Sequence, residues 1–151
     1  MHYDRVTPLH MACLKGNIQI VNVQSIDNST PLCDASAGGN IECVKILLEA
    51  GAWVNPPLLL STPLHEASLR EGAKVLLSYG ANIYQKDLNG RKPRQLCDPN
   101  SDLALFLLLC ETQPKSLKLC CRLAIIKHLG ASSLKCLASL PIPSLILRYL
   151  E

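Results

Sequence analysis

Apolar residues recur through most of this chain at the three- and four-residue spacing that places side chains on one face of a helix. Val44 is followed at this spacing by Leu47 and Leu48, and a further apolar run extends from Leu103 to Cys110. The second run predicts a short helix over 102–111. Because Leu, Ala and Ile dominate such segments, the pattern predicts an all-α fold of stacked helices.

A final helix is predicted after residue 115, where Leu117, Cys121 and Ile125 recur at four-residue intervals. Residues with this spacing lie above one another on one helix face. Ser116 opens the run, and a serine oxygen at that position can accept an unpaired backbone N–H as an N-cap. The stripe has no partner of its own in the sequence, so we expect it to be exposed.

The phrase Thr-Pro-Leu-x-x-Ala occurs three times, beginning at Thr7, Thr30 and Thr62. Threonine is a good helix N-cap, and proline suits the first helical position, where a missing N–H costs nothing. Self-similarity of this kind indicates a repeat array. After the second and third copies, Gly51 and Gly80 stand where a helix is expected to end in a left-handed residue, which glycine tolerates without a Cβ penalty.

These phrases resemble the ankyrin repeat, and the resemblance covers roughly residues 5–95. It implies a solenoid of helix-turn-helix repeats with short finger loops, in which the histidine of the phrase ties neighbouring repeats through backbone contacts. That histidine is present at two copies and replaced by Cys33 in the other. The residues expected to have a structural role are Thr7, Pro8, His10, Thr30, Pro31, Gly51, Thr62, Pro63, His65 and Gly80.

The array is shortened relative to the ankyrin period of about 33 residues. The intervals between the three threonines are 23 and 32 residues, and most of a second helix is missing after Val21. The segment 67–73 is too short for two helices and a normal loop. We expect a truncated first repeat over 1–27, a whole repeat over 28–60, a shortened repeat over 61–88 and a degenerate repeat with a capping helix over 89–111.

The missing helix is expected to leave apolar side chains uncovered. Without it, Ile41, Val44 and Leu47 or Leu48 would face water on the inner side of the second repeat. Each side chain of this size loses about 1.5–3 kcal/mol when unburied, against a total of about 5–15 kcal/mol for a domain. We therefore expect residues 1–114 to be only marginally stable alone.

Composition excludes several classes of protein. Hydrophobic residues make up 48% and aromatic residues 4% of the 151, which argues against a disordered chain and against a β-sandwich or barrel core. No signal peptide is evident, and no apolar run approaches the ~20 residues of a spanning helix, so we expect an intracellular protein that does not enter a membrane.

The charge is distributed unevenly. Residues 1–114 carry nine Lys/Arg and eleven Asp/Glu, hence −2, whereas 115–151 carry six Lys/Arg against one Glu, hence +5. Because the basic part is mainly apolar, we interpret its charges as the polar rim of a docking face and expect no nucleic-acid binding.

We expect no catalytic, metal or cofactor site. The eight cysteines lie mostly within apolar patterns, no Cys-x-x-Cys occurs and the four histidines form no cluster with them, so buried free thiols are expected. Cys121 and His128 are seven residues apart, two helical turns, too far for a nucleophile and its base. Trp53, Tyr79 and Tyr84 are either binding anchors or covers for the edge of the stack.

The end of the chain resembles a SOCS box, over residues 112–151. The resemblance rests on the helix that begins after Ser116 together with Leu-Pro-Ile-Pro at 140–143. It implies a box of three helices that binds elongin C and a cullin. The residues it assigns are Ser116, Leu117, Cys121 and Ile125 to elongin C, and Leu140, Pro141, Ile142 and Pro143 to the cullin.

Ankyrin repeats followed by this box are similar to the family of ankyrin repeat and SOCS box proteins, of which the chain looks like a shortened member. The resemblance implies a non-catalytic substrate receptor of a ubiquitin ligase, in the cytoplasm or also the nucleus. Its partners would be elongins B and C, a fifth-class cullin with its RING subunit, and an unidentified protein destined for proteasomal degradation. Two alternatives stay open: a passive scaffold, and an elongin-binding competitor without a substrate.

Overall fold

A computed structural model describes residues 18–25, 29–56 and 61–130, and every regular element in these ranges is an α-helix. The helices are α2 (Ile18–Val21), α3 (Pro31–Ala37), α4 (Ile41–Glu49), α5 (Pro63–Glu66), α6 (Arg70–Ser78), α7 (Pro93–Leu96), α8 (Asp102–Thr112) and α9 (Leu117–Leu129). The expected all-α fold is therefore confirmed over the described part of the chain. None of its helices is long and apolar enough to cross a membrane.

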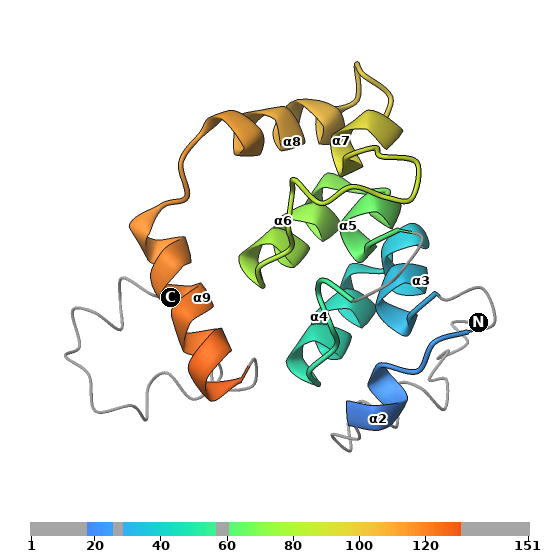
Figure 1. The fold of residues 1–151 in the computed structure, drawn as a ribbon, viewed down its shortest axis with the longest axis vertical. Coiled ribbons are helices and arrows are strands. Elements are labelled where there is room, and N and C mark those ends of the chain that lie inside the picture. The colour runs from blue at the N-terminus through green and yellow to red at the C-terminus, as the bar shows by residue number, and fades with distance from the viewer. Residues whose placement is uncertain (1–17, 26–28, 57–60, 131–151) are drawn as a thin grey trace, which may run out of the picture.

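The helices from α3 to α8 form pairs that stack side by side (Figure 1). In each pair the first helix packs on its successor, as α3 does on α4 and α7 on α8. First helices also contact first helices, and second helices contact second helices, from one pair to the next. The result is a two-layered solenoid, with α9 standing beside α6 after a short linker (Figure 1).

Local sequence explains where these helices begin and end. The hydroxyl oxygen of Thr30 accepts the backbone N–H of Cys33 at 3.3 Å, and Pro31 occupies the first helical position of α3. Two later helices end at glycines in the left-handed region, Gly51 at φ 91° and Gly80 at φ 95°. At each of these ends a further backbone bond closes the turn, because the N–H two positions after the cap reaches back to the helix.

The core runs through the stack as a line of leucines. Fully buried leucines come from α3, α4, α5, α6 and α8 in turn: Leu32, Leu48, Leu64, Leu76 and Leu107. Burying a leucine contributes about 1.5–3 kcal/mol. Because each leucine packs against the neighbouring pair, the stability of the array resides in the interfaces between pairs.

The expectation that the second repeat is left uncovered is wrong for its main apolar residues. Val44, Leu47 and Leu48 are 1%, 3% and 1% exposed, and Ile41 is half-buried. The physical reason is Val21 at the end of the one-turn helix α2, which is fully buried and belongs to the same core cluster. Marginal stability of residues 1–114 was expected because these side chains would face water. Since they are buried, that reason does not hold.

The segment 67–73 holds only the loop after α5 and the first residues of α6, in agreement with its expected shortness. The chain makes α5 as a single turn of four residues and begins α6 after only three more. The nine-residue α6 is as long as α4, so the deletion falls on the first helix of the pair. The following helix pair, α7 and α8, begins at Pro93, and Ser101 caps α8 by accepting the Ala104 N–H at 3.1 Å.

An asparagine joins the shortened first repeat to the next. The Asn22 side chain donates to the Gly51 carbonyl at 3.3 Å and accepts the Trp53 N–H at 2.8 Å. One repeat later, Asn55 makes the same two bonds, to the Gly80 carbonyl at 2.9 Å and from the Asn82 N–H at 2.8 Å. The truncated repeat therefore keeps the clamp of an intact one.

The position of this clamp shows how the first repeat was shortened. In the second repeat, Val44 is the first buried residue of α4, and Val54 and Asn55 follow the glycine turn. In the first repeat, Val21 takes the place of Val44, and Asn22, the next residue, takes the place of Asn55. The stretch 45–54 has no counterpart there. Val21 supplies the core contact and its neighbour supplies the clamp, so the interface closes although most of a helix is absent.

We predict that replacing Asn22 by alanine lowers the free energy of unfolding by about 1 kcal/mol or more, because two backbone groups lose their partner. Urea denaturation of the full chain measures this. The control is Gln24→Ala, two residues away and exposed, which should change stability little. Equal effects of the two substitutions would contradict the clamp.

Candidate functional site

The helix α9 begins and ends as its sequence indicates. The Ser116 hydroxyl accepts the Leu119 N–H at 3.2 Å, and the helix closes at Gly130, which has φ 88°. No residue of α9 is fully buried. A helix that is largely apolar yet nowhere buried presents surface for a partner.

Two of the α9 faces are apolar. Leu117, Cys121 and Ile125 share one face, on which Leu117 is 69% exposed and the other two are half-buried. Leu119 and Leu123 lie on roughly the opposite face, since each residue turns the helix by about 100°. The sequence interpretation found the first face and missed the second.

The second face is turned to the array. A cavity of about 350 Å³ separates the start of α9 from the end of α6 and of α8, and its apolar lining includes Leu77, Ile83 and Leu119. One turn further along α9, Leu123 lies against Gly80. Leu119 and Leu123 thus lie toward the array, whereas on the other face Leu117 is exposed and Cys121 and Ile125 are half-buried, so the expectation of an exposed stripe holds for Leu117 alone.

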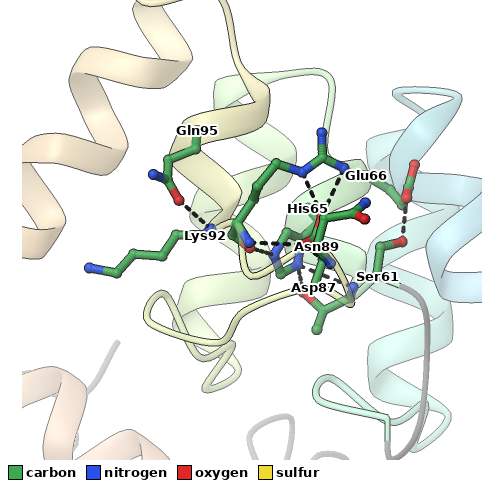
Figure 2. Close-up of polar contacts among 9 residues, drawn as sticks. Ser61, His65, Glu66, Asp87, Asn89, Lys92 and Gln95 are labelled. Carbon is green, nitrogen blue, oxygen red and sulfur yellow. Dashed lines mark hydrogen bonds and ion pairs between the residues drawn. The ribbon is translucent and has the colours of Figure 1, made fainter.

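The histidine of the third phrase ties its repeat to the next one (Figure 2). Nδ1 of His65 accepts the backbone N–H of Thr62 at 3.2 Å and lies 2.8 Å from the Thr62 hydroxyl. Because Nδ1 accepts, Nε2 carries the proton and donates to the Arg91 carbonyl at 2.9 Å. At the equivalent place Cys33 is buried, and its sulfur accepts from the Thr30 hydroxyl of its own repeat at 3.3 Å.

The loop that receives this histidine is organised by Asp87. Its carboxylate accepts the backbone N–H groups of Asn89 at 2.9 Å and Arg91 at 2.8 Å, and the Arg91 Nε–H at 3.0 Å (Figure 2). These bonds, led by the one from the Arg91 backbone, hold the pKa of the Asp87 carboxyl below its ordinary value. The side chain is only 3% exposed, so the loop is fixed from within.

Serine–carboxylate pairs repeat on successive first helices. Ser29 donates to Asp34 at 2.6 Å, and Ser61 donates to Glu66 in the next repeat (Figure 2). Each serine directly precedes the capping threonine, so the pair is built into the repeat. The sequence interpretation missed these pairs, and the fixed spacing of a serine five residues before an acid was the signal.

The aromatic residues divide into two groups. Tyr79 packs on the core, and Tyr84 donates its hydroxyl to the Glu111 carbonyl at 2.9 Å, with the Lys92 ammonium 5.3 Å from its ring centre. These two tyrosines cover the edge of the stack, although Tyr84 stays 54% exposed. Trp53 is 47% exposed after the turn at the end of α4 and is the better candidate for a partner contact.

The end of the array presents an apolar surface that the sequence interpretation also missed. Leu105, Leu108 and Leu109 of α8 are 53%, 40% and 53% exposed on the face opposite the core. The run Leu103–Cys110 looked continuous in sequence, with no polar face to indicate which side of the helix would be outward.

The cysteines are less buried than expected. Only Cys33 is fully buried among those described, and Cys120 is exposed, so the expectation of buried thiols is wrong for it. Burial raises the pKa of the thiols of Cys33, Cys43, Cys97 and Cys110, which makes them poor nucleophiles. Within 18–25, 29–56 and 61–130 no group of three His, Cys, Asp or Glu side chains could hold a metal ion.

Several predicted site residues lie outside the described part of the chain. They are Thr7, Pro8 and His10 of the first phrase, and Leu140, Pro141, Ile142 and Pro143 of the second box motif. The assignments made to them from sequence stay predictions. The described part holds the remaining repeat residues and the first box motif.

Comparison with known families identifies both parts of the chain. The family described as "Ankyrin repeats (3 copies)" matches residues 9–87, and the family described as "SOCS box" matches residues 113–151. The second match includes all of α9 and the segment that follows it.

Individual relatives combine the same two parts. "Ankyrin repeat and SOCS box protein 11" from Homo sapiens is 34% identical over 157 residues, which cover 95% of this chain and 48% of the relative. "Ankyrin repeat and SOCS box protein 5" from Mus musculus is 30% identical over 158 residues, with 96% and 48% covered. The chain spans about half the length of these relatives.

A solved structure agrees with the fold. The crystal structure of the human ASB11 ankyrin repeat domain is 35% identical and superimposes with a TM-score of 0.56, covering 73% of this chain and 56% of that one. This likeness confirms the ankyrin solenoid.

We predict that the Asp87 loop loses its stabilising effect in acid. A carboxyl whose pKa is lowered by folding adds stability above its unfolded value, close to 3.8, and loses it as the pH falls further. The stability difference between wild type and Asp87→Asn should therefore be largest near neutrality and shrink below about pH 4. Urea denaturation from pH 3 to 7 measures it.

The control for this experiment is Glu42→Gln, which removes a carboxylate from an exposed ion pair with Lys45. Exposed pairs contribute little, so this variant should track the wild type throughout. A difference for Asp87→Asn that does not change with pH would contradict the role of the ionised carboxylate.

Proposed function

We propose that this chain, which belongs to the family of ankyrin repeat and SOCS box proteins, is a substrate-recognition subunit of an elongin–cullin–SOCS-box ubiquitin ligase. The box recruits the ligase and the array selects a protein for ubiquitination and proteasomal degradation. The chain is an adaptor and performs no chemistry itself, because ubiquitin transfer belongs to other subunits.

The observation that carries this proposal is the exposed Leu117 at the start of an apolar face of α9. Leu117 is 69% exposed at the first position of the helix, and Cys121 and Ile125 continue its face at one-turn intervals. An apolar side chain that the fold leaves in water gains about 1.5–3 kcal/mol when a partner buries it. We assign this face to elongin C, with elongin B bound alongside, and Ser116 to fixing the start of the helix.

The second contact belongs to the segment 140–143. Its Leu-Pro-Ile-Pro sequence contacts a fifth-class cullin, which brings the RING subunit. Proline fixes its backbone φ angle and lacks an N–H, so two prolines favour an extended course that presents the leucine and isoleucine. The family match over 113–151, which includes both motifs, supports this division.

The array supplies the surface for the target protein. Trp53 offers an exposed aromatic contact, and the serine–carboxylate pairs add polar groups at a regular spacing. We place the protein inside the cell, in the cytoplasm or also the nucleus, where elongins and cullins act. The division into repeats over 1–27, 28–60, 61–88 and 89–111, followed by a box over 112–151, is part of the proposal.

We predict that the full chain co-purifies with elongins B and C and that Leu117→Asn combined with Cys121→Phe abolishes this. Loss of a buried anchor costs about 2–4 kcal/mol, or roughly 30-fold or more in affinity. The matched control is Cys120→Phe, the same exchange one residue earlier and on another side of the helix, which should keep the elongins. Equal recovery from the double variant and the control would refute the assignment.

A second prediction separates the two motifs. Replacing Leu140, Pro141, Ile142 and Pro143 by alanine should abolish co-purification of the cullin and leave elongins B and C bound, because the motifs belong to different segments. Quantitative mass spectrometry of the purified complexes measures both. If elongins disappear together with the cullin, the tail acts as one unit and the division of roles is wrong.

A further inference from the structure

The two apolar faces of α9 have different surroundings. Leu117 is 69% exposed, whereas Leu123, on roughly the opposite side of the helix, faces the array. Within the described part of the chain, α9 contacts α6. The box helix therefore lies beside α6, although α8 directly precedes it in the chain (Figure 1).

The contact point is the glycine turn at the end of α6. A Cβ atom at Gly80 would lie 3.1 Å from Cδ2 of Leu123, a tight contact that the leucine could accommodate only by shifting a few tenths of an ångström. The turn has φ 95°, so glycine is needed for the backbone as well as for the space. Leu119, one turn earlier on α9, lines the adjoining cavity together with Leu77 and Ala81.

The linker alone does not fix the helix. From Gln113 to Ser116 every residue is exposed, and the backbone bond of this segment to α8 is that of the Gln113 N–H with the Leu109 carbonyl, which ends that helix. A segment with few buried contacts opens at low cost. A contact that positions α9 lies further along the helix, at Leu123.

We propose that the Gly80 turn is the seat of the box helix, where Leu123 packs and sets the orientation of α9 relative to the array, while the Leu117 face stays free for elongin C. Leu123 and Gly80 are positioning residues. The consequence of this orientation for a ubiquitin ligase rests on the proposed function. The packing of Leu123 on the Gly80 turn does not depend on that function.

This arrangement has a functional consequence. Because the array and elongin C use different faces, both contacts form at once and neither competes with the other. The array is then held in a fixed direction relative to the ligase, and a target bound on it is presented from a constant position. The glycine serves two purposes, ending α6 and leaving room for the leucine of α9.

A matched pair of leucine substitutions on the full chain tests the proposal. Leu123→Asn should raise amide hydrogen exchange at Gly80 and Ala81 by about tenfold or more, because the turn loses its cover. It should leave the affinity for elongins B and C within about twofold. Leu117→Asn should do the reverse, weakening elongin binding by about tenfold or more with exchange unchanged. Leu123→Met should behave as the wild type.

A double-mutant cycle of Gly80 and Leu123 tests the same contact by changing the array residue. Gly80→Ala should accelerate exchange in α9 of the wild-type chain, and less so in a Leu123→Ala chain, where the clashing Cδ2 is gone. Gly90→Ala is the control for backbone strain, since Gly90 has φ 76° and a Cβ there would meet nothing within 4 Å. If the effects of Gly80→Ala and Leu123→Ala on exchange in α9 are additive, the proposed packing of Leu123 on the Gly80 turn is wrong.

Each of the other possible results also contradicts a specific part of the proposal. If Leu123→Asn leaves exchange at Gly80 unchanged, the seat is wrong. If it weakens elongin binding as much as Leu117→Asn does, the division into two faces is wrong. If the wild-type chain binds no elongin, the proposed function fails, while the exchange measurements and the cycle still test the seat on the chain alone.

Discussion

The structure depends on one constraint: no helix pair in this array can bury its own apolar side. Leu32, Leu48, Leu64, Leu76 and Leu107 are buried in one core cluster that runs through neighbouring pairs. Stability is then shared among interfaces, and a change in one repeat is tolerated if its interface still closes. The first repeat shows this, because a buried Val21 and the Asn22 clamp keep its interface while most of a helix is missing.

The same constraint explains how the box is attached. An array must end somewhere, and its last helix, α8, presents three partly exposed leucines instead of a polar surface. The chain then turns back, and α9 packs on α6, one pair earlier in the stack. Leu123 lies against the Gly80 turn at the end of α6, and Leu117 is exposed on the opposite face of α9.

Local features were predictable from the sequence, and contacts between distant residues were not. Thr30 and Ser116 cap helices, and Gly51 ends one, because of bonds within a few residues. The Val21 contact, the packing of Leu123 on Gly80 and the outward side of α8 depend on segments far apart in sequence. The four-residue spacing of Leu117, Cys121 and Ile125 predicted one apolar face of α9. The role of the second face, with Leu123, could be recognised only from its contact with α6.

The most direct test is the structure of the full chain bound to elongins B and C, determined by crystallography or electron microscopy. The account predicts that Leu117, Cys121 and Ile125 lie within contact distance of elongin C while Leu123 remains against Gly80. A complex in which the Leu117 face is turned to the array, or in which α9 has left the Gly80 turn to bind elongin C, would contradict it.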